Sequence, residues 1–163
     1  MSTLTPFVRI LFVSALPLVF AAPAMADATV TASLWDKGAM DMGKPMMMGM
    51  GMHGDMKMAM MGIKLDGSTV PAGKVTFDVQ NISKETVHEM LVAPVTDENT
   101  VLPFNEKEGR VDEEVVKDLG EVSELEPGKS GSLTLALKPG NYILYCNIPG
   151  HYMAGMWTML TVK

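Results

Sequence analysis

Residues 142–163 read YILYCNIPGHYMAGMWTMLTVK, and this stretch predicts two β-strands joined by a loop. The run from Tyr142 to Cys146 is apolar and aromatic, and a second such run extends from Trp157 to Lys163. Runs of this kind, bounded by Gly and Pro, are typical of strands. Pro149-Gly150 predicts a turn soon after the first run. The C-terminal end of the chain therefore indicates β-structure.

Period-two alternation of apolar residues predicts more strands upstream. They are Thr29 to Trp35, Met58 to Leu65, Lys74 to Asn81, Val87 to Pro94, Val115 to Leu119 and Gly131 to Lys138. The long polar connection from Asp97 to Glu114 leaves room for a short helical piece. Seven or eight short strands without a long amphipathic helix predict an all-β fold, an antiparallel β-sandwich.

The C-terminal loop carries three evenly spaced side chains that bind soft metals. Four residues separate the thiol of Cys146 from the imidazole of His151, and four more separate His151 from the thioether of Met156. Ala154-Gly155 permits a close backbone approach, so the loop can direct all three groups toward one point. A thiolate, imidazole nitrogen and a weak axial thioether are the ligands of trigonal type 1 copper sites.

Such a site needs a second histidine, and the chain offers His53 and His88 besides His151. His53 belongs to a stretch of methionine and glycine, whereas His88 lies in a predicted strand. A ligand on a distant strand would fix the loop to the rigid body of a sandwich. We therefore predict His88 as the fourth ligand, with His53 as the alternative.

Cys146 is the single cysteine of a chain that we expect to be exported. Exported proteins usually hold their cysteines in disulfides, and one cysteine cannot form an internal pair. Three interpretations are open: an intermolecular link, a buried apolar thiol or a metal ligand. The order and spacing of the neighbouring donors favour the metal ligand.

The loop, His88 and the segment PAGKVTFDVQN at 71–81 resemble the cupredoxin, or blue copper, family. The resemblance covers about Ile63 to Lys163, and azurin-like members share both four-residue spacings. It implies a Greek-key β-sandwich with one copper near one end. By position the resemblance implies that His88, Cys146 and His151 are the equatorial ligands and that Met156 is the axial ligand.

Two positions depart from the family pattern. Many cupredoxins have Asn after the first histidine and Ser or Thr after the cysteine, where they help to hold the ligand segments together. This chain has Glu89 and Asn147 instead. Groups around the ligands tune geometry and potential. A carboxylate beside His88 either raises the basicity near the copper or faces solvent.

A methionine-rich and glycine-rich stretch precedes this region, with eleven of the seventeen methionines between Met40 and Met61. Thioethers suit Cu(I), and His53 adds a nitrogen that also accepts Cu(II). The candidates for weak copper binding are Met40, Met42, Met46, Met47, Met48, Met50, Met52, His53, Met56, Met58, Met60 and Met61. The alternative interpretations are a tolerant loop or a surface for a protein partner.

Residues 1–26 have the pattern of a secretory signal peptide. Arg9 precedes an apolar run from Ile10 to Ala22, and Ala24-Met25-Ala26 suits cleavage. The run is short for a membrane span, so no insertion is expected after cleavage. We expect a periplasmic chain in which 27–62 holds the first strand and the copper-handling segment, and 63–163 holds the main body of the domain.

The formal net charge of −6 argues against nucleic acid and anionic membranes as partners. Size and segment order resemble the small periplasmic copper-tolerance cupredoxins of bacteria. We expect a role in copper tolerance, with one type 1 centre and additional weakly bound Cu(I). The alternative is a diffusible one-electron carrier of a respiratory chain, and a redox or copper-transfer protein would be the partner. An enzyme is disfavoured because copper oxidases need a second centre with more histidines.

Overall fold

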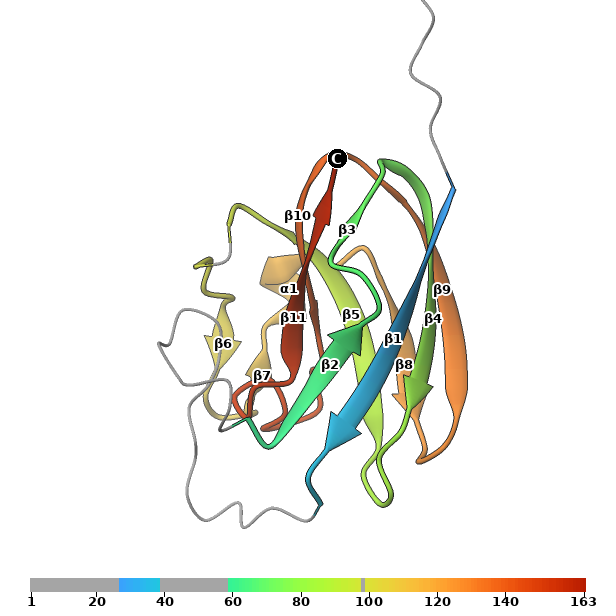
Figure 1. Ribbon diagram of the computed structural model, residues 1–163. Coiled ribbons are helices and arrows are strands. Elements are labelled where there is room, and N and C mark those ends of the chain that lie inside the picture. The colour runs from blue at the N-terminus through green and yellow to red at the C-terminus, as the bar shows by residue number, and fades with distance from the viewer. Residues whose placement is uncertain (1–26, 39–58, 98) are drawn as a thin grey trace, which may run out of the picture.

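The computed structural model describes residues 27–38, 59–97 and 99–163, which form a β-sandwich of two facing sheets (Figure 1). The first sheet has the order β2 (Met61–Leu65), β1 (Ala28–Asp36), β4 (Gly73–Asn81) and β9 (Ser130–Leu137). The second has the order β3 (Thr69–Val70), β11 (Trp157–Val162), β10 (Gly140–Tyr145), β5 (His88–Val95) and β8 (Gly120–Leu125). A small ribbon of β6 (Phe104–Asn105) and β7 (Arg110–Val111) lies near the short helix α1 (Glu113–Val116).

The main core lies between the two sheets, and β4 shows how the sequence builds it. Val75, Phe77 and Val79 are buried, whereas the alternating Lys74 and Asp78 are exposed. Successive side chains of a strand point to opposite faces, so every second residue of β4 enters the core. Burial of each large apolar side chain contributes about 1.5–3 kcal/mol.

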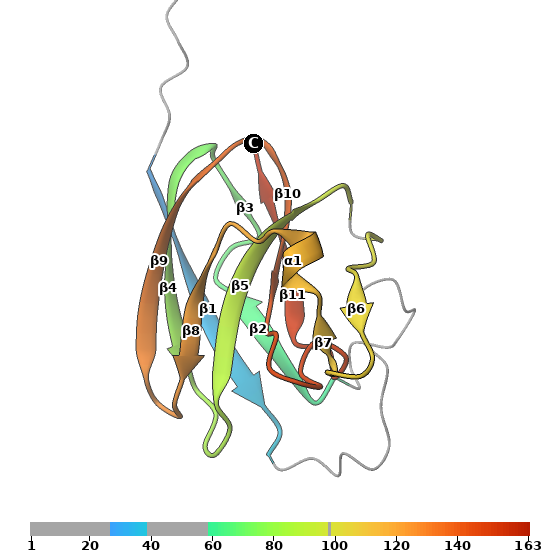
Figure 2. The same cartoon turned by 180° about the vertical axis from the view of Figure 1, so that it is seen from behind.

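The strands that carry the candidate site are buried on both faces. Leu91 of β5 and Ile143 and Tyr145 of β10 belong to a second apolar cluster, on the side away from the main core. Val111 and Tyr152 complete the cover from β7 and the C-terminal loop. Figure 2 shows β6, β7 and α1 on this side of the second sheet. Double-sided burial explains why β10 is continuously apolar from Tyr142 to Tyr145.

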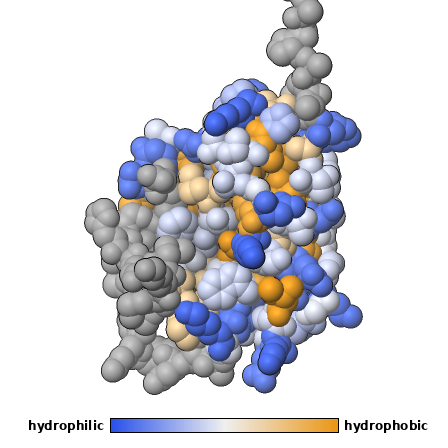
Figure 3. Space-filling view, viewed as in Figure 1, coloured by the Kyte–Doolittle hydropathy of each residue, from blue (hydrophilic) through white to orange (hydrophobic). Residues whose placement is uncertain are grey.

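The predicted all-β sandwich is confirmed, and the strand pairing is mixed. β1 runs parallel to β4, and β3 runs parallel to β11. The remaining described pairs are antiparallel. On the face seen in Figure 3, hydrophilic residues are interspersed with small apolar patches.

The predicted strand from Val115 to Leu119 is wrong. Residues 113–116 form the helical turn α1, which Asp112 caps by accepting a hydrogen bond from the Val115 N–H at 3.3 Å. Lys117, with a φ of 51°, ends the turn. The strand in this region is β8, which begins after the helical turn. Val122 is its one buried side chain, and its other residues are too polar to give an alternating apolar pattern.

Among the described residues, no helix is long and apolar enough to cross a membrane. β1 ends, β5 begins and the loop from β10 to β11 turns at the same end of the sandwich, the lower end in Figure 1. This end gathers segments that are far apart in the sequence, and it holds the candidate site.

Candidate metal centre

Two elements of the second sheet deliver the predicted metal-binding side chains. His88 is the first residue of β5, and Cys146 directly follows β10. His151 and Met156 lie in the loop that leads to β11. All four are buried, and His151 is the most accessible with 8% exposure. The structure therefore brings the four predicted residues to one end of the sandwich.

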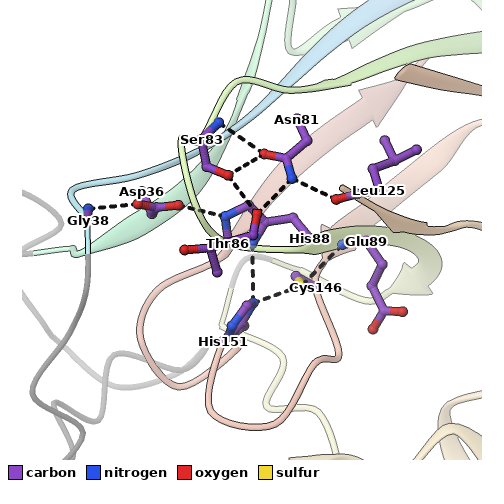
Figure 4. Close-up of polar contacts among 10 residues, drawn as sticks. All are labelled: Asp36, Gly38, Asn81, Ser83, Thr86, His88, Glu89, Leu125, Cys146 and His151. Atoms are coloured by element: carbon purple, nitrogen blue, oxygen red, sulfur yellow. Dashed lines mark hydrogen bonds and ion pairs between the residues drawn. The ribbon is translucent and has the colours of Figure 1, made fainter. Parts of the chain in front are cut away.

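The nitrogen and sulfur atoms converge on one point (Figure 4). The Nδ1 atom of His151 lies 3.3 Å from the Nδ1 of His88 and 3.3 Å from the Sγ of Cys146. These three donor atoms all lie within 4.8 Å of one another. Atoms bound to one ion at about 2.0–2.3 Å lie about 3–4 Å apart, so the spacing suits a shared metal ion.

Backbone hydrogen bonds shape the loop. The Cys146 N–H donates to the Met156 carbonyl at 3.1 Å, which joins the two ends of the loop. The His151 N–H donates to the Ile148 carbonyl at 2.9 Å across the turn at Gly150, whose φ of 84° suits glycine. Met156 and Cys146 then enter the same core cluster. The chain itself thus keeps Met156 and Cys146 close together at this end of the sandwich.

The turn before His88 is held by the buried side chain of Asn81. Its Nδ2 donates to the carbonyls of Thr86 at 2.8 Å and Leu125 at 2.7 Å. Its Oδ1 accepts from the backbone N–H of Ser83 at 3.0 Å and from the Ser83 hydroxyl at 2.7 Å. Since Leu125 pairs with His88 across β8 and β5, this network fixes the start of β5.

The imidazole of His88 has a second polar partner on its other nitrogen. Its Nε2 lies 3.1 Å from the Oδ2 of Asp36, the last residue of β1. Figure 4 shows Asp36 and His151 on different sides of the His88 ring. Neither Asp36 nor Asn81 was predicted as a site residue from the sequence, because neither belongs to a local motif of ligands.

The two departures from the family pattern take part in the site. The Asn147 N–H donates to the Oε1 of Glu89 at 2.9 Å, and the Glu89 N–H points at the Cys146 sulfur at 3.5 Å. The Asn147 side chain also binds both backbone groups of Val111. Glu89 is 8% exposed, so its carboxylate does not face solvent. These residues join the ligand segments.

Burial controls the protonation of the donor groups in the metal-free protein. Burial raises the pKa of the Cys146 thiol to about 12, and the Glu89 N–H offsets part of this rise. Burial and then the neighbouring His88 lower the pKa of His151 to about 4. Burial also lowers the pKa of His88, although Asp36 opposes the shift. Both imidazoles are therefore neutral near pH 7, which is the form that binds a metal.

The methionine-rich candidates fall mostly outside the described residues. These are Met40, Met42, Met46, Met47, Met48, Met50, Met52, His53, Met56 and Met58. Met60 is half-buried. Met61 begins β2 and is 3% exposed in the core, where its side chain packs with apolar residues.

A copper-binding β-sandwich is the class of protein that this fold and this donor set define. The sequence model of the copper-binding proteins of the plastocyanin/azurin family matches residues 51–163. The chain belongs to this family. With the thiol, thioether and two imidazoles gathered at one end, membership supports one type 1 copper centre.

The solved structure of rusticyanin supports the same fold. The chain is similar to rusticyanin from Thiobacillus ferrooxidans with 18% identity and a TM-score of 0.51, over 83% of this chain and 76% of that one. Auracyanin B matches with 21% identity and a TM-score of 0.49, over 89% and 93%. The reduced auracyanin of Roseiflexus castenholzii matches with 24% identity and a TM-score of 0.46, over 61% and 86%. A search of curated proteins gave no match.

Proposed function

We propose that His88, Cys146, His151 and Met156 bind one copper ion and that the protein serves copper tolerance in the bacterial periplasm. The observation that carries the copper site is the convergence of three buried donor atoms within 4.8 Å. Bound copper supplies a one-electron couple between Cu(I) and Cu(II). We propose a carrier and not an enzyme, with copper ions and a redox or copper-transfer protein as partners.

The residues of the site prepare it for a cation. The thiol of Cys146, with a pKa near 12, keeps its proton until a metal ion displaces it. The neutral rings of His88 and His151 offer lone pairs without first losing a proton. Because backbone hydrogen bonds and the Glu89–Asn147 contact hold the loop, the donors need little rearrangement on binding.

The methionine-rich segment supports a role in copper tolerance over electron transfer alone. Its soft thioethers suit Cu(I). The described residues that flank it lie beside the proposed copper site, because Asp36 pairs with Met61 and the Lys37 N–H donates to the Met60 carbonyl at 2.8 Å. Asp36 in turn contacts His88. Copper captured by the segment would be released next to the buried site.

A diffusible electron carrier is the second candidate function. His151 is the most accessible of the four proposed ligands, with 8% exposure, and its ring is the natural place for an electron to enter or leave. The family supports electron transfer in general.

Copper loading tests the metal site. Addition of Cu(II) to the purified mature protein should produce the intense visible band of thiolate-to-copper charge transfer. Cys146→Ser and His88→Ala should abolish it, whereas His53→Ala should leave it unchanged. A band that persists in Cys146→Ser would sink the assignment. Loss of the band in His53→Ala but not in His88→Ala would replace His88 with His53.

The role of the segment is tested by replacing the methionines from Met40 to Met58 with leucine. Leucine keeps the apolar volume and removes the sulfur. The replacement stops short of Met60 and Met61 because Met61 pairs with Asp36 and the Met60 carbonyl accepts from the Lys37 N–H. We expect the Cu(I) bound per chain to fall to one and growth on copper to fall. Unchanged tolerance, in a strain that needs the whole gene on copper, would favour the electron carrier.

Export is tested by the N-terminus of the mature protein. Cleavage after Ala26 predicts Asp27 as the first residue of protein recovered from the periplasm. Full-length protein retained in the cytoplasm would contradict the proposed location.

A further inference from the structure

The contact between Asp36 and His88 links the two sheets at the copper site. Asp36 closes β1 in the first sheet, and His88 opens β5 in the second. The distance from Oδ2 to Nε2 is 3.1 Å, and the two side chains are 4% and 0% exposed. A carboxylate and an imidazole so thoroughly removed from water form a defined pair and not a loose surface contact.

Asp36 is itself fixed from three directions. Its Oδ1 accepts a hydrogen bond from the Gly38 N–H at 2.7 Å, and Oδ2 faces the His88 ring. The Thr86 side chain donates a further hydrogen bond to the Asp36 carboxylate. Both oxygens of the carboxylate are thus engaged, and the group has one orientation.

The position of the Asp36 carboxylate decides which nitrogen of His88 carries the proton, because Oδ2 faces Nε2 at 3.1 Å. The carboxylate can only accept a hydrogen bond, so Nε2 must be the protonated nitrogen. The lone pair then resides on Nδ1, the atom that lies 3.3 Å from the Nδ1 of His151. The neutral ring thus offers its free electron pair toward the other donors, and it cannot rotate without breaking the contact with Asp36.

We infer that Asp36 is a positioning residue for the copper ligand His88, which fixes its tautomer and ring orientation and lowers the reduction potential of the centre. This inference rests on the proposed copper site. Cu(II) carries one more positive charge than Cu(I), so a buried negative charge one ring away stabilises Cu(II) more. Low water access strengthens the effect. Asp36 therefore favours the oxidised state of copper.

The first test is the reduction potential of the loaded protein. Asp36→Asn keeps the shape and can still accept from Nε2–H, but it removes the charge. We expect the ratio of Cu(II) to Cu(I) at a fixed applied potential to fall about tenfold, which is about 59 mV for a one-electron couple. Asp66→Asn is the matched control. The Oδ1 of Asp66 accepts from the Thr31 N–H at 3.0 Å in an exposed position, so its charge should not affect the centre.

The second test needs no copper. Nitrogen-15 chemical shifts of the metal-free protein at pH 8 report which ring nitrogen of His88 is protonated. We expect Nε2–H alone in the wild type and in Asp66→Asn, and a mixture of tautomers in Asp36→Ala. If Asp36→Ala fails to fold, Asp36→Asn provides the measurement, with a smaller change expected.

The outcomes separate this inference from the proposed function. Equal potentials in the wild type and Asp36→Asn would overturn the inference while the thiolate band still supported the copper site. A proton on Nδ1 in the wild type would overturn it as well. If the wild type did not develop the thiolate-to-copper band, the proposed copper site would be wrong. The nitrogen-15 shifts of His88 would then still show whether Asp36 orients the ring.

Discussion

The carboxylate of Glu89 accepts a hydrogen bond from the backbone N–H of Asn147 at 2.9 Å. This contact joins the strand that begins at His88 to the segment that follows Cys146. The Glu89 N–H also faces the Cys146 sulfur, so one residue approaches the thiol segment with both its backbone and its side chain. The chain thereby keeps the link between ligand segments although both residue types differ from the family pattern.

Glu89 should make the stability of the metal-free protein depend on pH. Burial raises the pKa of Glu89 to about 7; Asn147 opposes the shift, and Glu124, Glu121 and Glu113 add to it. The folded protein then binds this proton more tightly than the unfolded chain does. The contribution of Glu89 to the free energy of unfolding should fall by about 1–3 kcal/mol between about pH 4.5 and pH 7. Urea unfolding at several pH values measures it.

Glu89→Gln is the control for this pH dependence. The lowered pKa of His151, about 4, has the opposite effect in an overlapping range, because stability gained from a neutral histidine rises with pH. The Glu89 contribution is therefore read from the difference between wild type and Glu89→Gln. A difference that does not change with pH would show that Glu89 has an ordinary pKa.

Asn81→Ala should destabilise the protein by about 2–4 kcal/mol, since it removes a part-buried hydrogen bond to each of the Thr86 and Leu125 carbonyls and leaves the Ser83 hydroxyl as the remaining side-chain donor to Thr86. We also expect a weaker or shifted copper band, because these bonds hold the start of β5. Asn141→Ala is the control. Its Nδ2 donates to the Thr96 carbonyl at 3.2 Å in an exposed place, and we expect a loss below about 1 kcal/mol. Chemical denaturation measures the free energy of unfolding of both variants. Similar losses in Asn81→Ala and Asn141→Ala would contradict a special role for Asn81.

Met156→Leu should keep the fold and the visible band but raise the reduction potential. Leucine has nearly the volume of methionine, so the buried position should cost less than about 1.5 kcal/mol. Loss of the axial sulfur removes a donor and leaves a more apolar site, which disfavours the more highly charged Cu(II). Spectroelectrochemistry of the two proteins checks the direction. An unchanged potential would mean that Met156 is not a ligand.

Gly62→Ala should destabilise the pairing of β1 with β2. Gly62 pairs with Trp35, and a Cβ atom at Gly62 would lie 2.8 Å from the indole ring. We expect a loss of about 1–3 kcal/mol from this overlap. At Gly67 a Cβ would meet nothing within 4 Å, so Gly67→Ala should be close to neutral. Thermal unfolding of both variants tests this difference. Equal melting temperatures would contradict the predicted overlap at Gly62.

The sequence was informative where chemistry or alternation is local. The convergence of the donor side chains in the loop from Cys146 to Met156 could be predicted, because turn residues and donors alternate within one short segment. β4 was predicted because its core side chains alternate strictly. β8 was missed because it is an edge strand with few buried residues. The contact of Asp36 with His88 spans 52 positions, and it depends on how two sheets face each other, which no local pattern encodes.

The pairing of Asp36 with Met61 has a consequence for the evolution of the protein. The chain leaves the first sheet at the end of β1 and returns to it at the start of β2. These two points are adjacent in the sheet. Lineages can therefore lengthen, shorten or replace the sequence in between without shifting the strands that support His88. Selection on the proposed copper binding of that segment can then act separately from selection on the proposed copper site.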